Sequence, residues 1–189
     1  MAEETQNTGF GVSTEDLKSY DWQSLIAAAS SHDCITYVEI FAAQAKAFEA
    51  AGDKRGHRVF GFLWAVASFF PNFDSREHPF GAMMTRPDGT HSPIPEELTK
   101  GDCETLKAVL PDVKDSEFRA RIADVLWVSR KDYKAAQVAV TSYIKAAALL
   151  ENDLWPPFAE RLGRAIQLGA QLGYKKEFHQ KCHLQRIVL

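Results

Sequence analysis

The strongest constraint on the fold comes from one stretch of the sequence, ADVLWVSRKDYKAAQVAVTSYIKAAALLE at residues 123–151. Apolar residues recur there at helical spacing on both sides of a short polar segment, SRKD. Asp132 in that segment can cap the helix that follows it. Ala135, Ala139 and Ala146 give this second helix a flat face for close packing. The stretch therefore predicts two helices joined by a tight turn.

Two further segments show the same pattern. Apolar residues at helical spacing flank a turn at Gly52, and a helix that opens near Trp155 is expected to end at Gly173 and to be followed by another. The turns at Asp132 and Gly173 are about forty residues apart, a spacing typical of helical solenoids. The predicted fold class is therefore all-α, with stacked antiparallel helical hairpins forming a short solenoid-like array in a single domain, residues 13–189.

Capping residues place the starts of the shorter helices. Ser13 and Asp16 have the spacing of a capping box, in which each side chain accepts a hydrogen bond from the other residue's backbone. Asp21 and Asp115 each precede a helical pattern as N-cap residues. A further short helix is predicted to begin at Asp102.

Two parts of the chain fall outside the helical pattern. Residues 1–12 are polar and are predicted to be disordered. Residues 71–101 contain five prolines, so an irregular insertion is expected there. Within it, Pro87, Asp88 and Gly89 favour a tight turn. We expect a small β-hairpin or a bare turn around these three residues.

Composition excludes several classes of function. The formal net charge is −3 and no local basic patch is evident, so nucleic-acid binding is not expected. The longest apolar run, residues 59–70, is shorter than the roughly 20 residues that a membrane helix needs. The N-terminus lacks the features of a signal peptide, and the three widely spaced cysteines suit free thiols in a reducing compartment. A cytoplasmic protein without a membrane partner is expected.

Two resemblances follow from these segments. DYKAA at residues 132–136 resembles the turn and second-helix start of a tetratricopeptide repeat. ADVLW, DYKAA, SYIKAA and ERLGRAIQL are together similar to the helical N-terminal region of larger uncharacterised bacterial proteins, over roughly residues 100–175. That resemblance implies a helical fold. Those larger proteins carry a further helical domain that has been compared with nucleotide-binding and abortive-infection proteins.

Few residues have the spacing of a chemical site. His179 and His183 lie one helical turn apart, as pairs of zinc ligands do, but Cys182 falls on another side of the helix and no third ligand is evident. A solvated histidine pair is therefore favoured over a metal site. No phosphate-binding loop, dinucleotide fingerprint or nucleophile elbow is present, and no cofactor is expected.

Asp124 stands out because it lies among apolar residues. The favoured interpretation is a boundary carboxylate paired with Arg121 or Arg161. The alternative is a carboxylate that lines a ligand groove together with Trp127 and Tyr143. Trp127 is itself more typical of a hairpin anchor than of a platform on which a base stacks.

Apolar residues that the predicted hairpins do not bury indicate interaction surfaces. On a helical wheel, Leu184 and Ile187 point away from the preceding hairpin. The candidate surface residues are Leu184, Ile187, Val188, Phe62, Trp64 and Phe69. The last three belong to a helix that is apolar nearly all round, so this helix is either central or covered by a partner. We therefore expect a non-enzymatic interaction or scaffold module that binds a protein partner or its own second copy. The alternative is a regulatory component of phage defence whose catalytic domain is on another chain.

Overall fold

The computed structural model describes residues 9–28, 34–68, 70–71, 82–85, 91–93, 98–149 and 155–173. The helices occur in the order α1 (Thr14–Lys18), α2 (Trp22–Ala28), α3 (Cys34–Ala50), α4 (Lys54–Ala67), α6 (Lys100–Val109), the 3-10 turn η1 (Leu110–Asp112), α7 (Ser116–Arg130), α8 (Tyr133–Ala148) and α9 (Trp155–Gln171). The predicted all-α class is confirmed, with neighbouring helices packed as antiparallel pairs.

Capping contacts explain where several of these helices begin. The Ser13 hydroxyl accepts from the Asp16 backbone N–H at 3.1 Å, and the Asp16 carboxylate accepts from the Ser13 N–H at 3.0 Å. Asp115 accepts from the Phe118 N–H at 2.7 Å, and Asp132 accepts from two backbone amides of α8 at 3.1 Å. Asp21 likewise accepts from the Ser24 N–H at 3.3 Å. The predicted capping box and the three predicted aspartate caps are confirmed.

The start of α6 differs from the prediction. The N-cap is Thr99, whose hydroxyl accepts from the Asp102 N–H at 3.2 Å, while the Asp102 carboxylate accepts from the Thr99 N–H at 2.9 Å. Asp102 is therefore inside the helix, because it is the acidic member of a capping box. The helix begins at Lys100 rather than at Asp102.

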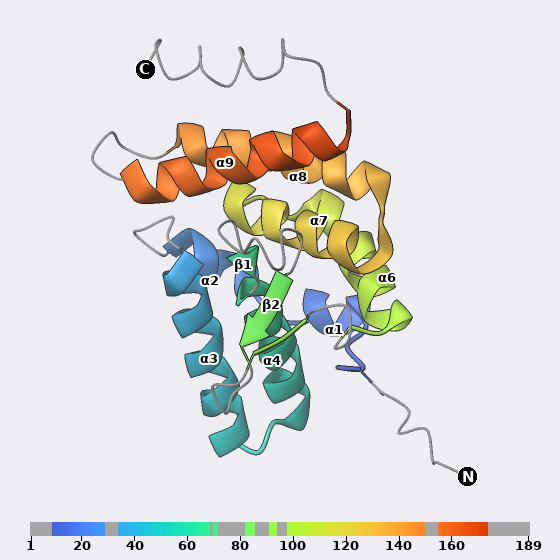
Figure 1. The fold of residues 1–189 in the computed structure, drawn as a ribbon. Helices are drawn as coiled ribbons and strands as arrows, with labels where there is room; N and C mark the ends of the chain where they lie inside the picture. Colours follow the sequence, from blue (N-terminus) through green and yellow to red (C-terminus); the bar gives the residue numbers. More distant parts are fainter. Residues whose placement is uncertain are drawn as a thin grey trace.

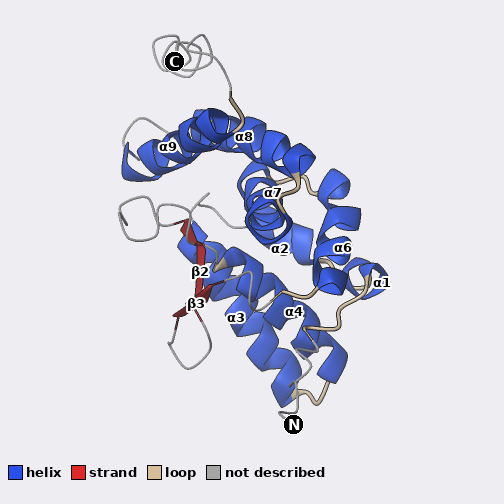
Figure 2. Ribbon diagram, turned by 45° about the vertical axis from the view of Figure 1, so that its right-hand side comes forward, coloured by secondary structure: helices blue, strands red, loops and turns tan. Residues whose placement is uncertain are grey.

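Three antiparallel pairs account for most of the helix packing: α3 with α4, α7 with α8, and α8 with α9. The turns contain Gly52 with a φ of 73° and Lys131 with a φ of 54°, both in the left-handed region that ends helices sharply. Helices α7, α8 and α9 pack together as one group, and the α3–α4 hairpin extends away from it, crosswise to α8 and α9 (Figures 1 and 2).

The core joins the two hairpin groups through Phe118 near the start of α7. Its ring centroid lies 5.5 Å from that of Trp22 in α2, 6.1 Å from that of Tyr37 and 5.4 Å from that of Phe41 in α3. Phe118 and Phe41 are both completely buried. Aromatic packing of this kind holds α2 and α3 against the group formed by α7, α8 and α9.

Short strands lie between α4 and α6. β1 (Phe70–Pro71), β2 (Ala82–Thr85) and β3 (His91–Pro93) pair antiparallel in the order β1-β2-β3. β2 and β3 stand on either side of the Pro87–Gly89 segment, with Met84 opposite Ser92. β2 also contacts α4, so this small sheet lies against the first hairpin (Figure 2).

Residues 9–12, here called the strap, belong to the N-terminal segment that was predicted to be disordered, and they contact α6. The Phe10 N–H donates to the Asp102 carboxylate at 3.2 Å, and the Thr105 hydroxyl donates to the Val12 carbonyl at 2.9 Å. These contacts cannot be inferred from local sequence because they join residues more than ninety positions apart. Residues 1–8 lie outside the described part of the chain.

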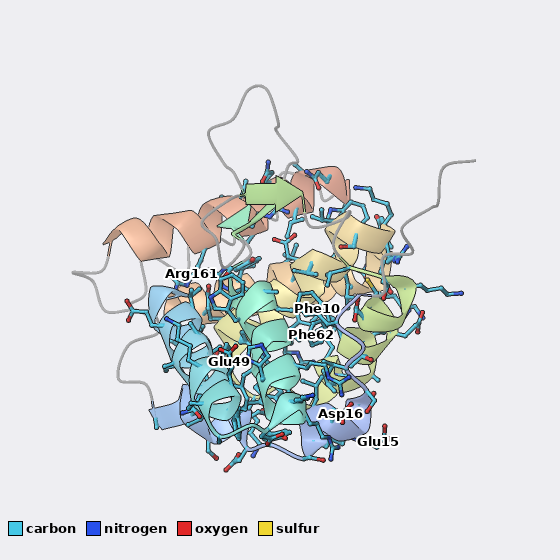
Figure 3. The ribbon with its side chains drawn as sticks, turned by 90° about the horizontal axis from the view of Figure 1, so that it is seen from below. Phe10, Glu15, Asp16, Glu49, Phe62 and Arg161 are labelled. Carbon is cyan, nitrogen blue, oxygen red and sulfur yellow. The ribbon has the colours of Figure 1, made fainter. Side chains whose placement is uncertain are left out.

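The strap also changes the interpretation of α4. The Phe10 and Phe62 ring centroids are 5.2 Å apart, and Phe62 is 0% exposed (Figure 3). The strap and the core therefore cover the ring of Phe62, a residue that the sequence analysis placed on an interaction surface. Trp64 is half-buried and packs partly against the core. Phe69 lies outside the described residues.

Candidate functional site

Charged side chains of α7 and α9 meet in the interior between α7, α8 and α9. Each is at most 3% exposed, as is the tyrosine from α8 that joins them. We call this group the buried cluster, and its members are Glu117, Arg121, Asp124, Tyr143, Arg161 and Arg164. Charges removed from water need close partners, so the contacts within the cluster decide what it can do.

Asp124 is the most enclosed member, with an exposure of 0%. Its two carboxylate oxygens accept from Arg164 Nε at 2.7 Å and Arg164 Nη2 at 2.6 Å, in a two-pronged ion pair. The Tyr143 hydroxyl donates to Asp124 Oδ2 at 3.1 Å. The predicted arginine partner is present, but Arg164 takes the place of Arg121 or Arg161.

Glu117 forms the second centre of the cluster. Its Oε1 accepts from Arg121 Nε at 3.0 Å, and its Oε2 accepts from Arg161 Nε at 2.5 Å. Arg121 also donates through Nη1 to the Ala67 carbonyl at 3.3 Å, at the end of α4. Glu117 therefore links α7 to α9 and, through Arg121, to the first hairpin.

Helical spacing carries a signal for this cluster that the sequence analysis missed. Glu117 and Asp124 are two turns apart on α7, and Arg161 and Arg164 are one turn apart on α9. Each pair therefore occupies one face of its helix. Two acids on one face of α7 and two arginines on one face of α9 indicate ion pairs between these helices.

Electrostatics fix the protonation of the cluster around Asp124. Burial, together with the nearby Asp124 charge, raises the pKa of Tyr143 well above its usual value. Burial by itself lowers the pKa of Arg164, but the charge and hydrogen bonds of Asp124 outweigh this effect and raise the pKa above its usual value. Tyr143 therefore stays protonated and Arg164 stays charged near neutral pH. These two groups are suited to holding helices together rather than to exchanging protons.

A hollow of about 300 Å³ opens next to the buried cluster. It is lined by Trp127, Val128, Lys131, Arg164 and Gln171, and we call it the Trp127 hollow. Arg164 contributes to both places, since it lines the hollow and pairs with Asp124. The charge of Arg164 is paired with Asp124, whereas Lys131 adds a positive charge at the hollow that favours an anionic group.

Hydrogen bonds fix the walls of the Trp127 hollow. Trp127 Nε1 donates to the Gln171 side-chain oxygen at 3.1 Å, and the Tyr133 hydroxyl donates to the Leu172 carbonyl at 2.8 Å. The Tyr133 ring meets the Trp127 ring edge to face at 6.4 Å, and Lys131 Nζ lies 5.4 Å from the Trp127 ring centroid. The α7–α8 turn is thus tied to the end of α9.

The structure therefore separates the three residues that the sequence analysis grouped as a ligand groove. Trp127 lines a hollow, whereas Asp124 and Tyr143 are buried. Tyr143 donates to Asp124, and Asp124 pairs with Arg164. Trp127 also serves as the predicted hairpin anchor through Gln171. Sequence reasoning missed Lys131 and Gln171, since nothing local shows that the end of α9 meets this turn.

Several other predictions fall on undescribed positions. The interaction residues Leu184, Ile187 and Val188 and the weak metal candidates His179 and His183 lie outside the described residues. Within the described ranges, no three His, Cys, Asp or Glu side chains gather in a way that could hold a metal ion. None of the described helices is long and apolar enough to cross a membrane.

Comparison with known proteins gives a family without an assigned activity. No curated protein and no solved structure matches the chain. One family model, described as a domain of unknown function (DUF7380), matches residues 7–181. The match reaches well beyond the resemblance noted over roughly residues 100–175 and includes the strap, both hairpin groups and the buried cluster. The chain therefore belongs to the family of the domain of unknown function DUF7380.

Proposed function

We propose that this chain is a non-enzymatic interaction module of helical-repeat type, which binds a protein partner or a second copy of itself. The observation that carries the proposal is the Trp127 hollow, a concave surface with an aromatic wall at the tip of the α7–α8 hairpin. The successive antiparallel packing of α7, α8 and α9 supports the repeat-like description. Interfaces often centre on tryptophan, tyrosine and arginine.

The surroundings of the Trp127 hollow indicate the chemistry of a complementary partner. Tyr133 is 51% exposed although its ring packs on Trp127, so an aromatic edge borders the hollow. Lys131 is exposed beside the ring. A partner segment fits if it places a carboxylate beside Lys131 and an apolar side chain against Trp127 and Val128.

A pair of charge reversals tests the partner-binding proposal. Lys131→Glu reverses a charge in the lining of the Trp127 hollow, and Lys134→Glu makes the same change at an exposed position of α8 that is not among the lining residues. Affinity purification from the native cell, quantified by mass spectrometry, should give a protein that wild type and Lys134→Glu retain and Lys131→Glu loses. If both variants retain the same proteins, the Trp127 hollow is not the partner surface.

Self-association has a separate test at the C-terminal end of the sequence. Leu184→Asp with Ile187→Asp places two charges at positions whose apolar side chains are predicted to face a second copy. Light scattering should show a wild-type dimer or larger species that this double variant converts to a folded monomer. A wild type that is monomeric at high concentration excludes self-association and leaves a different protein as the partner.

A further inference from the structure

The strap is held in a way that depends on its first glycine. A Cβ placed on Gly9 would lie 2.2 Å from Asp102 Oδ2 and 2.6 Å from Thr99 Cγ2. Gly9 also has a φ of 59°, a conformation that other residues rarely adopt. A larger residue at this position would collide with α6. The contact therefore selects glycine immediately before Phe10.

The residues that hold the strap keep their places through contacts of their own. Asp102 Oδ2 accepts from the Thr99 N–H at 2.9 Å and from the Thr99 hydroxyl at 2.7 Å, as part of the α6 capping box. Phe62 and Thr105 belong to α4 and α6, which pack into the core. We call these four residues the strap site. The helices that carry them also have core contacts apart from the strap.

The strap site recognises both backbone and side chain. Asp102 accepts the backbone N–H of Phe10, and Thr105 donates to the carbonyl of Val12. The Phe10 ring packs on Phe62. This combination resembles the way proteins bind a short peptide segment, with backbone hydrogen bonds for affinity and one pocketed side chain for selectivity.

The strap itself is built to bend between its two anchored parts. Gly11 is exposed, has a φ of 61° and has no atom within 4 Å of the position of an added Cβ. Phe10 is half-buried, whereas Val12 is 4% exposed and directly precedes the Ser13 cap of α1. Phe10 can therefore leave the strap site while Val12 and α1 stay in place.

We propose that the strap site is a peptide-recognition site, filled in the resting molecule by the chain's own strap, and that a partner segment with glycine directly before phenylalanine competes for it. The attached strap acts at an effective concentration on the order of millimolar, so it keeps weaker segments out. This site is separate from the Trp127 hollow, and the proposal does not depend on the function proposed for that hollow.

Two alanine substitutions in the full-length chain separate the strap contact from backbone strain. Gly9→Ala and Gly11→Ala introduce the same side chain at nearly the same φ, 59° and 61°, but the new Cβ collides with α6 at Gly9 alone. Gly9→Ala therefore unseats the strap and leaves every residue of the strap site unchanged. Hydrogen exchange of the Phe10 amide reports this release, and circular dichroism checks the fold.

The probe is a fluorescent peptide with the sequence NTGFGVS, residues 7–13, followed by fluorescence anisotropy. Gly9→Ala should bind it at least about tenfold more tightly than wild type or Gly11→Ala, because the part of the strap site that holds Gly9 and Phe10 is no longer occupied in cis. Peptides with alanine in place of the glycine before phenylalanine, or in place of the phenylalanine, should not bind. Equal binding by all three proteins overturns the proposal.

Two further outcomes also overturn it. The first is a folded Gly9→Ala protein with a rapidly exchanging Phe10 amide that does not bind the peptide, since the vacated site then has no affinity of its own. The second is continued protection of the Phe10 amide in Gly9→Ala, since the strap site then accepts alanine as well as glycine before Phe10. Loss of partner binding at the Trp127 hollow changes neither result.

Discussion

Two arginine–carboxylate pairs in this molecule have the same chemistry but differ in their exposure to water. Arg164 and Asp124 join α9 to α7 with side-chain exposures of 4% and 0%, whereas Arg55 and Asp16 join α4 to α1 with exposures of 47% and 16%. Water screens the second pair and competes for its hydrogen bonds. The first pair has replaced water completely, so the loss of one partner leaves a buried charge with no substitute.

The largest expected effect comes from removing one arginine of each pair. Arg164→Ala should lower the free energy of unfolding by about 3–5 kcal/mol, because Asp124 stays buried without its ion-pair partner. Arg55→Ala, the matched control, should lower it by at most about 1 kcal/mol. Urea unfolding followed by circular dichroism measures both. Similar losses for the two variants would mean that burial does not separate the pairs.

A smaller effect is expected when the buried pair is replaced as a unit. Combining Asp124→Leu, Arg164→Met and Tyr143→Phe removes both charges and the hydroxyl that donates to Asp124. The stability of this triple variant should lie within about 2 kcal/mol of wild type and above that of Arg164→Ala. The same urea experiment applies. A triple variant less stable than Arg164→Ala would show that the ion pair is favourable in itself, beyond satisfying its own charges.

The smallest effect concerns acid and the exposed pair. Hydrogen bonds from the Ser13 backbone and hydroxyl, with a further one from Arg55, lower the pKa of Asp16 from 3.8 to about 2. Because the folded state keeps this carboxylate charged to lower pH than the unfolded chain does, its stabilisation is complete above 3.8 and is lost as the pH falls through about 2.

Asp16→Asn provides the measurement for this effect. The difference in unfolding free energy between wild type and Asp16→Asn should be largest near about pH 5 and should shrink toward pH 2. Tyr143, whose pKa is raised, stays protonated throughout this range. A difference that is constant from pH 5 to pH 2 would mean that the hydrogen bonds of Asp16 do not lower the pKa of its carboxylate in the folded state.

Local features of the fold were predictable from the sequence. Ser13, Asp115 and Asp132 cap helices through backbone amides two or three residues away, so the sequence contains both partners side by side. The turn at Gly52 depends on a conformation that glycine adopts at little cost. These features explain why the hairpins that turn at Gly52 and Asp132 were predicted correctly. The second helix of the hairpin predicted at Gly173 lies outside the described residues.

Contacts between distant residues were not predictable in the same way. Asp124 was expected to pair with an arginine, but the choice of Arg164 over Arg161 depends on the axial position of α9 relative to α7. Phe62 was assigned to a candidate interaction surface because a helix that is apolar nearly all round is either central or covered by a partner, and its sequence does not show what covers its second face. The covering residue, Phe10, lies in a segment that composition alone marks as disordered.

The strap also has a consequence for the order in which the chain can fold during synthesis. The Val12 carbonyl is bound by Thr105, which is 93 positions later in the sequence. At translation rates of about 5–20 residues per second, roughly 5–20 s pass between the synthesis of the strap and the synthesis of Thr105. Through that interval the α3–α4 hairpin can already pack, while the side of Phe62 that Phe10 later covers remains uncovered on the nascent chain. A chaperone or a subunit made nearby therefore has its best access to this face before translation ends.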